Sequence, residues 1–396
     1  MLGTNYALMK KFAPLLVLCL VFSSSLPSAN AALGPESIPA IFNELLKNPS
    51  LSNPAMIVID ESTGKVIYEH NADSQRKPAS VMKILSATAT LEYLDPTASF
   101  NTAVSISQDS KSVVIRGSFD PWISLNDLVA NKMHRASLPY LAFNVMSAIK
   151  KANNGSLKGY SVSYSGLYSQ DVANLKAFWK KRKFTPALKQ LSEAQSFVEQ
   201  GEPVVAQNSP TVTEILDWTM LWSDNLLAER LARLSSKAAG NSFDDKGVAK
   251  TFQGMLSHLE IDSSQLIAKD ASGLSKENRI TARMMGELLL KLRKEEKFAL
   301  LYNSLPVAGV SGTLKERFVT TAPSAVGLIH AKTGTLNGTA TLAGYVQSTD
   351  REYVFVTLAD EIAKGNTALN KARAAIDRVL GRIAAPNIPT EIIPAP

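Results

Sequence analysis

Cysteine and histidine are scarce in this sequence of 396 residues, which holds one cysteine, Cys19, and four histidines. A single thiol cannot form an intrachain disulfide, so a disulfide scaffold is excluded. Structural zinc sites need closely spaced cysteine or histidine ligands, and these histidines are scattered along the chain. The sequence therefore predicts no bound metal and no other cofactor.

The sequence also lacks a large excess of charge of one sign. Lysine and arginine number 42 against 35 aspartates and glutamates, which gives a net charge of +7. No segment resembles the basic stripe of a nucleic-acid-binding protein, so we predict no nucleic-acid partner. A mildly basic protein could still be held near an anionic cell envelope.

The N-terminus carries an apolar run that is too short to span a membrane. Lys10 and Lys11 precede the run Phe12 to Phe22, and small residues follow as far as Ala31. These are the parts of a secretory signal peptide in their usual order, so we expect residues 1–31 to be cleaved off. A membrane anchor is the alternative, but a span needs roughly 20 apolar residues. We therefore predict an exported protein, in the periplasm or on the extracellular face of the cell envelope, without a transmembrane anchor or a thiol.

The rest of the chain, within a sequence that is 45% hydrophobic and 19% charged, suits one large or two modest globular domains. A hairpin early in the chain and further strands near its end predict an α+β fold, in which both ends share one antiparallel sheet covered by helices. We expect a main domain from residues 32–96 and 206–385, an inserted α/β subdomain from 97–205, and a proline-containing tail from 386–396. The predicted elements of the main domain are helices at 37–47, 80–94, 281–294 and 365–382, two helices on either side of 223–225, a hairpin at 55–71, and strands at 329–338, 339–346 and 352–360.

No Gly-x-Ser-x-Gly motif is present, and His70, His134, His258 and His330 lack the context of a catalytic triad. Lysine is therefore the candidate base for acyl transfer. A lysine with its ordinary pKa of about 10.4 is almost entirely protonated at pH 7, so burial and a second cation must lower that pKa.

Four Ser-x-x-Lys patterns occur, and only one opens an apolar helix. Ser62/Lys65 spans a hairpin turn, Ser74/Lys77 lies in a polar loop, and Ser147/Lys150 lies late in a helix. Ser80 heads the helix that carries Lys83 one turn along, where free backbone amides favour a developing oxyanion. The alternative is that Ser80 merely caps the helix.

Two further triplets could complete the chemistry, although each also has a plain structural interpretation. Ser223-Asp224-Asn225 could be a simple turn between helices, and Lys332-Thr333-Gly334 a strand with a solvated lysine. If Lys332 lies near Lys83, it supplies the second cation that the mechanism requires.

Taken together and in this order, the three motifs resemble the signature of penicillin-binding proteins and serine β-lactamases. The chain further resembles the D-Ala-D-Ala carboxypeptidases and endopeptidases of the penicillin-binding protein 4 type, through the segments "NSPTVTEILDWTMLWSDNLLAERL", "DASGLSKENRIT", "LPVAGVSGTLKERF" and "HAKTGTLNGTATLAGYV". The resemblance covers most of residues 50–360. It implies a β-lactamase/transpeptidase-like fold with the inserted subdomain between the first and second motifs.

The resemblance also implies roles for individual residues. Ser80 would attack the carbonyl between the two terminal D-alanines of a peptidoglycan stem peptide, and Lys83 would accept its proton. Ser223 would pass a proton to the departing amine, and Asn225 would hold the substrate amide and Lys83. Asp224 would support the loop. β-Lactam antibiotics would act as covalent inhibitors on Ser80.

The third motif would bind the substrate. Lys332, Thr333 and Thr335 would hold the terminal carboxylate, and Gly334 would give the ligand close access to the backbone. The backbone N–H groups of Ser80 and Thr335 would form the oxyanion hole.

The chain departs from the family pattern at two places. Ala271 stands where the family's Asp-Gly-Ser-Gly stretch has its first glycine, and the segment before Asp120-Pro121 is less glycine-rich. A substrate contact from Asp120 is therefore a secondary expectation, and an Asp-Pro turn is the simpler interpretation.

Two other functions remain open at this stage. A serine β-lactamase would share the same residues, but the chain has no Glu-x-x-Leu-Asn segment between the first two motifs to activate the deacylating water. A non-catalytic receptor for muropeptides or β-lactams would use the same cleft, although three intact motifs argue for catalysis. The sequence does not decide between carboxypeptidase and cross-link endopeptidase activity.

Overall fold

The computed structural model describes residues 35–109, 111–349 and 351–384. The predicted signal peptide, residues 1–31, and the predicted tail, residues 386–396, lie outside this range. None of the helices in the described residues combines the length and the apolar character needed to cross a bilayer.

The main sheet joins strands from both ends of the chain, as the sequence predicts. Its order is β2-β1-β10-β9-β8, and every neighbouring pair is antiparallel. The first strand pairs with the last along its whole length, from Ala55 opposite Leu358 to Asp60 opposite Tyr353. The strands are β1 (Ala55–Asp60), β2 (Val66–His70), β8 (Ile329–Leu336), β9 (Thr339–Ser348) and β10 (Arg351–Ala359).

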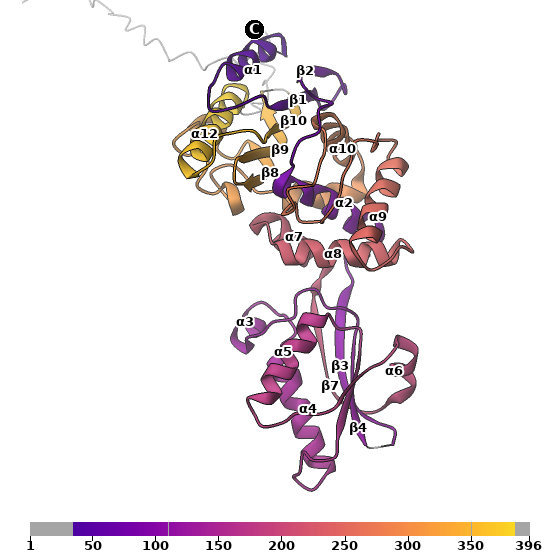
Figure 1. The fold of residues 1–396 in the computed structure, drawn as a ribbon. Helices are drawn as coiled ribbons and strands as arrows, with labels where there is room; N and C mark the ends of the chain where they lie inside the picture. Colours follow the sequence, from indigo (N-terminus) through magenta and orange to yellow (C-terminus); the bar gives the residue numbers. More distant parts are fainter. Residues whose placement is uncertain (1–34, 110, 350, 385–396) are drawn as a thin grey trace, which may run out of the picture. The chain divides into compact units, whose positions relative to one another are not determined.

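Helices cover both faces of this sheet, because its strands are apolar on both sides (Figure 1). Ile57 and Ile59 of β1 belong to one hydrophobic cluster, which includes residues of α2, α8, α9 and α10. Met56 and Val58, which point the other way, belong to a second cluster with α1 and α12. The helices of the main domain are α1 (Ile38–Leu46), α2 (Lys83–Tyr93), α7 (Val212–Trp222), α8 (Asn225–Ala238), α9 (Asp245–His258), α10 (Ala282–Lys294), α11 (Ala299–Ser304) and α12 (Asn366–Ile383).

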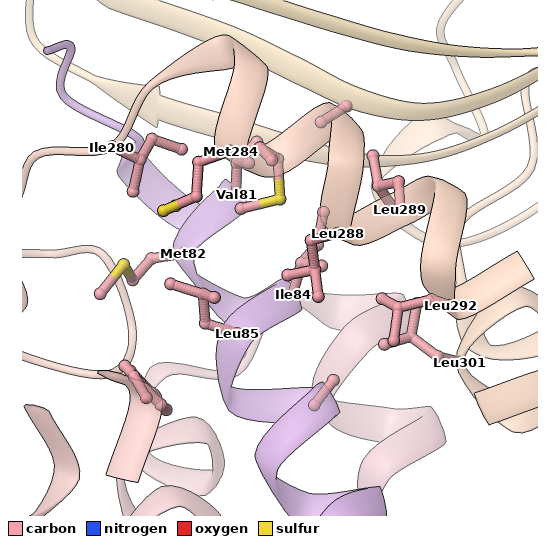
Figure 2. Close-up of a cluster of buried hydrophobic side chains, with 14 of the residues drawn as sticks. Val81, Met82, Ile84, Leu85, Ile280, Met284, Leu288, Leu289, Leu292 and Leu301 are labelled. Carbon is pink, nitrogen blue, oxygen red and sulfur yellow. The ribbon is translucent and has the colours of Figure 1, made fainter. Parts of the chain in front are cut away.

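The apolar face of α2 anchors the segment that carries Ser80. Figure 2 shows Ile84 beside Leu288 of α10, and Val81, just before α2, beside Met284. Every residue from Lys83 to Leu91 is buried. Because the whole helix is enclosed, the residues just before it hold a fixed position relative to the sheet.

A second sheet is built from residues 99–211, with the order β6-β5-β4-β3-β7. It is mixed, since β5 runs parallel to both β4 and β6. Figure 1 shows α4 and α5 on one side of it and α6 on the other. Because β7 pairs with β3 as far as Thr211 opposite Ser99, this sheet extends beyond residue 205. The subdomain boundaries at 97 and 205 stay a prediction. The elements are β3 (Ser99–Ser107), β4 (Ser112–Gly117), α3 (Asp127–Lys132), α4 (Leu138–Ala152), β5 (Ser161–Ser165), α5 (Ser169–Lys180), β6 (Leu188–Gln190), α6 (Glu193–Glu199) and β7 (Gln200–Thr211).

Two helical features differ from the sequence predictions. The helix expected at 80–94 begins as a 3₁₀ turn, Ala79–Met82, and becomes α-helical only at Lys83. Helix α9 has no counterpart among the predicted elements. It contains Gly247 and Gly254, and glycine weakens a helix signal by about 1 kcal/mol relative to alanine.

Candidate active site

The backbone before Ser80 makes a sharp turn. Ala79 has φ +47°, a left-handed conformation that is unusual for a residue with a side chain. The N-cap of the following 3₁₀ turn is Pro78 and that of α2 is Met82, and neither makes a side-chain capping bond. The interpretation of Ser80 as a helix cap is therefore wrong.

Two glycines let other segments approach this turn closely. A Cβ atom at Gly273 would collide with the Ala79 carbonyl, and one at Gly334 would collide with the Pro78 carbonyl and the Thr341 hydroxyl. That hydroxyl donates to the Pro78 carbonyl at 2.8 Å. The space left by the absent side chain of Gly334 is therefore filled by the Pro78 carbonyl and the Thr341 hydroxyl. A role of Gly334 in binding substrate stays a proposal.

Lys83 connects the first motif to the second. Its Nζ donates to Ser80 Oγ at 3.0 Å, to Asn225 Oδ1 at 2.6 Å and to the Ser272 carbonyl at 2.7 Å. The side chain is fully buried. The spacing along α2 thus brings the amine to Ser80 from one turn away, as the sequence predicts.

Burial changes the charge of this amine. It lowers the pKa of Lys83 to about 8, against the opposing attraction of Asp270, Glu229 and Asp224. At pH 7 about one Lys83 in ten is then neutral, compared with about one in a few thousand for an exposed lysine. The expectation that burial lowers this pKa is confirmed, and Lys83 is poised to act as a base near neutral pH.

The rate of acylation is expected to follow this titration. Below about pH 8 it should fall roughly tenfold for each pH unit, because only neutral Lys83 can accept the Ser80 proton, and above pH 8 it should level off. The check is the second-order rate of labelling by a fluorescent penicillin between pH 5.5 and 9.5. A flat profile would exclude Lys83 as the base.

The second motif is both an interhelical turn and part of the site. Helix α7 ends at Trp222, and its C-cap residue Ser223 has φ +60°. Asp224 caps the start of α8 by accepting from the Leu227 N–H at 3.0 Å. Asn225 is the first residue of α8 and receives the Lys83 bond. The turn expected as an alternative is present, and the backbone it creates points Ser223 and Asn225 at two different lysines.

Lys332 is the second of these lysines and is fully buried, so the alternative of a solvated lysine is wrong. Its Nζ donates to Ser223 Oγ at 2.8 Å and to the Thr333 carbonyl at 3.0 Å. Burial and repulsion from Lys83 lower its pKa well below the ordinary value. The three motifs meet through these two amines. That Lys332 in turn lowers the pKa of Lys83 stays a prediction, because burial is what lowers it here.

The strand carrying Lys332 lies at the edge of the main sheet. The Ala331 N–H donates to the Pro306 carbonyl at 2.9 Å, on the side away from β9. Because alternate residues of a strand point their backbone groups the same way, the N–H groups of Thr333 and Thr335 also point away from β9. Thr333 donates its hydroxyl to Thr313 Oγ1 at 2.8 Å. This open edge offers backbone donors to a ligand.

A serine, a buried lysine base and a serine–lysine pair beside an open strand edge are the parts needed for acyl transfer. The sequence model of the D-Ala-D-Ala carboxypeptidase 3 (S13) family matches residues 40–138 and 174–383.

The chain belongs to the S13 family.

Relatives of known activity agree with this assignment. The chain is 30% identical over 376 residues to the carboxypeptidase DacB of Mycolicibacterium smegmatis, in an alignment that covers 84% of this chain and 80% of that one. It is 25% identical over 425 residues to the D-alanyl-D-alanine carboxypeptidase of Actinomadura sp. (strain R39), covering 78% of each chain. The protein is a D-Ala-D-Ala carboxypeptidase, as the sequence motifs predict.

Solved structures confirm the α+β fold. Penicillin-binding protein 4 of Haemophilus influenzae superposes with a TM-score of 0.66 at 16% identity, covering 86% of this chain and 98% of that one, and that protein has also been solved with a β-lactam. An endopeptidase of Bdellovibrio bacteriovorus, solved with an immunity protein, gives a TM-score of 0.59 at 17% identity and covers 83% and 92% of the two chains. The internal segment that the S13 model leaves unmatched, 139–173, lies in the second sheet and its helices.

One segment of this S13 enzyme contacts the site although no sequence motif assigned it a role. The Ser272 carbonyl accepts a bond from Lys83, and the N–H groups of Ala271 and Ser272 donate to Glu229 Oε1 at 3.0 and 2.8 Å. Ser86 donates to the Ala271 carbonyl at 2.6 Å, so the loop is fixed although Ala271 replaces the family's glycine. Glu229 lies one turn beyond Asn225 on α8, and that i, i+4 spacing is the signal that could have found it.

Glu229 also sets the pKa of Lys83, which its charge raises. Glu229→Gln keeps an oxygen that can accept from the loop but removes the charge. We expect the acidic limb of the acylation profile to move to lower pH, because the protonated form of Lys83 loses one stabilising neighbour. The measurement is the same labelling series between pH 5.5 and 9.5, with the melting temperature of both proteins checked as a control for folding. An acidic limb that stays at the same pH or moves to higher pH would contradict this prediction.

Asp120 lies apart from the three motifs in its bonding. Its Oδ1 accepts from the Trp122 N–H at 2.8 Å, which is the turn that the sequence favoured. Among the described residues, Oδ2 has no hydrogen-bond partner although it is buried, and burial raises the pKa of this carboxyl to about 7. A contact between Asp120 and substrate stays a proposal.

Within the described residues, no three His, Cys, Asp or Glu side chains are grouped as a metal site requires.

Proposed function

We propose that this carboxypeptidase cleaves the bond between the two terminal D-alanines of peptidoglycan stem peptides through an acyl-enzyme on Ser80. The observation that carries the proposal is the position of the Lys83 amine. It is buried, and it bonds at once to Ser80 of the first motif and Asn225 of the second. A serine with an ordinary pKa needs such a base within hydrogen-bond reach.

In the first step Ser80 Oγ attacks the carbonyl carbon of the penultimate D-alanine, and its proton passes to Lys83 Nζ. The negative charge then moves to the carbonyl oxygen. The N–H groups of Ser80 and Thr335 stabilise it, one at the start of a helix and the other on the open edge of β8. Donors of this kind contribute about 2.7–4 kcal/mol each in other hydrolases.

Collapse of this intermediate breaks the peptide bond. Ser223 gives a proton to the departing amine and is well placed for this, because Lys332 Nζ donates to its oxygen and can replace the proton. Lys332, Thr333 and Thr335 bind the carboxylate of the departing D-alanine. Water then attacks the ester on Ser80. Its proton replaces the one that Lys332 gave up, Lys83 returns its proton to Ser80 Oγ as the ester bond breaks, and the shortened peptide is released.

A β-lactam would enter the same path and stop after acylation. Its leaving group stays tethered, and no glutamate of the type that class A β-lactamases use stands between the first two motifs. We therefore propose that penicillin traps the enzyme.

The likeness in fold to an endopeptidase supports a second activity, cleavage of D,D-cross-links. Both activities require the cell envelope as the location, in agreement with the predicted signal peptide.

The test uses purified full-length mature protein with a labelled penicillin, a monomeric pentapeptide muropeptide and a cross-linked dimer. We expect the label on the peptide that contains Ser80, release of D-alanine from the monomer, and cleavage of the dimer if the second activity is present. Steady hydrolysis of the β-lactam at rates like those of a substrate would indicate a β-lactamase instead. Binding of muropeptide without any D-alanine release would indicate a receptor.

A further inference from the structure

Helix α12 brings a guanidinium to the strand that carries the third motif. Arg373 Nη2 donates to Thr335 Oγ1 at 2.7 Å, and its Nη1 donates to Asn370 Oδ1 at 3.2 Å. Thr335 is exposed, whereas Lys332 and Gly334 of the same strand are buried. Arg373 therefore lies on the same side of β8 as the threonine hydroxyls.

Arg373 is not paired directly with an acid among the described residues. Both of its hydrogen-bond partners are neutral side chains, Asn370 and Thr335. Asp377, one turn further along α12, pairs with Arg317 and accepts from Thr321. Burial and the nearby Arg317 lower the pKa of Arg373, and the charge of Asp377 opposes them. Two partly buried cations therefore share one carboxylate, and a further anion beside Arg373 would stabilise this arrangement.

The substrate supplies an anion at this place. In the proposed reaction the leaving D-alanine carries a free carboxylate, and the N–H groups of Thr333 and Thr335 face the open edge where it would lie. Lys332 cannot neutralise that carboxylate alone, because its amine is fully buried and already bonded to Ser223 and Thr333. A planar guanidinium matches a carboxylate with two parallel hydrogen bonds, which an ammonium does not.

We propose that Arg373, with Thr335, binds the carboxylate of the leaving D-amino acid and thereby makes the enzyme selective for a free C-terminus. This rests on the proposed function at Ser80. Arg373 does not take part in proton transfer. It contributes binding energy in the Michaelis complex, so its loss raises KM more than it lowers kcat.

The experiment compares a peptide that ends in D-Ala-D-Ala as the free acid with the same peptide as its C-terminal amide. For Arg373→Gln we expect kcat/KM to fall about 10- to 100-fold for the acid, mostly through KM, and to change little for the amide. Arg373→Lys should recover part of the loss, since it keeps the charge but not the paired donors. Arg378→Gln is the matched control, because Arg378 is an exposed arginine of the same helix. It should behave as wild type.

A purely structural role has a different outcome. If Arg373 only holds Thr335 in place, Arg373→Gln should have no further effect in a Thr335→Ala background, and the acid and amide should lose equally. Either result would overturn the proposal, as would an unchanged KM for the acid. The labelling of Ser80 by penicillin is measured alongside. If Ser80 is not labelled in wild type, the proposed function fails, whereas normal labelling with an unchanged acid-to-amide ratio rejects Arg373 alone.

Discussion

The Ser80→Ala variant is expected to release D-alanine at least about 10⁴-fold more slowly than wild type and to take up no labelled penicillin. Within the described residues, Ser80 Oγ is the hydroxyl bonded to the Lys83 amine, whose other partners are an amide oxygen and a backbone carbonyl. The backbone N–H of residue 80 remains, and so does the open edge of β8. Peptide binding should therefore survive, which separates a catalyst from a receptor.

The matched control is Ser62→Ala, which removes the serine from a competing Ser-x-x-Lys pattern. Ser62 is exposed in the β1–β2 turn, where its hydroxyl donates to Asp60 Oδ1 at 2.7 Å. That variant should keep full D-alanine release and full labelling. Labelling of Ser80→Ala at the wild-type rate would remove Ser80 from the mechanism.

The Lys83→Met variant is expected to be acylated about 10³-fold more slowly, because methionine fills a similar volume but cannot accept the Ser80 proton. The substitution also leaves Asn225 Oδ1 and the Ser272 carbonyl without their donor. Each acceptor that loses its partner in a buried site costs about 1–3 kcal/mol, so the melting temperature should fall as well. Rates are therefore compared at a temperature where both proteins are folded.

Lys65→Met serves as the control for this change, since Lys65 is the exposed lysine of the Ser62 pattern. It should change neither the acylation rate nor the melting temperature. A rate for Lys83→Met within tenfold of wild type would assign proton transfer to another group, and Lys332, which donates to Ser223, would be the next candidate.

The layout of the main sheet was predictable from the sequence, because the pattern of apolar residues and turns is clear there. The apolar runs at Ala55–Asp60 and near the C-terminus have the pattern of buried strands. Pairing β1 with β10 buries the apolar residues of both strands. Helix α9 was not predictable in the same way, since its glycines dilute the helical signal and its place depends on packing.

The active site was predictable as far as three short motifs could carry it. Sequence spacing brings Lys83 to Ser80 one turn away, but the left-handed turn at Ala79 packs against Gly273 and Gly334, which are distant in sequence. Ser272 accepts a bond from Lys83 and donates one to Glu229, but its loop belongs to none of the three motifs. Arg373 donates to Thr335 from 38 residues further along the chain. Such contacts leave no local pattern, because they depend on where the fold places elements that are far apart in sequence.

The order of strands in the main sheet also sets when the enzyme can become active. The nucleophile is synthesised early, yet β1 has only β2 beside it until β10 exists, and a lone hairpin is marginal in water. The turn before Ser80 is closed by Gly334 and Thr341, and Thr341 lies 263 residues beyond Pro78 in the chain. A growing chain therefore holds its serine without a working site until the strands β8, β9 and β10 have been made.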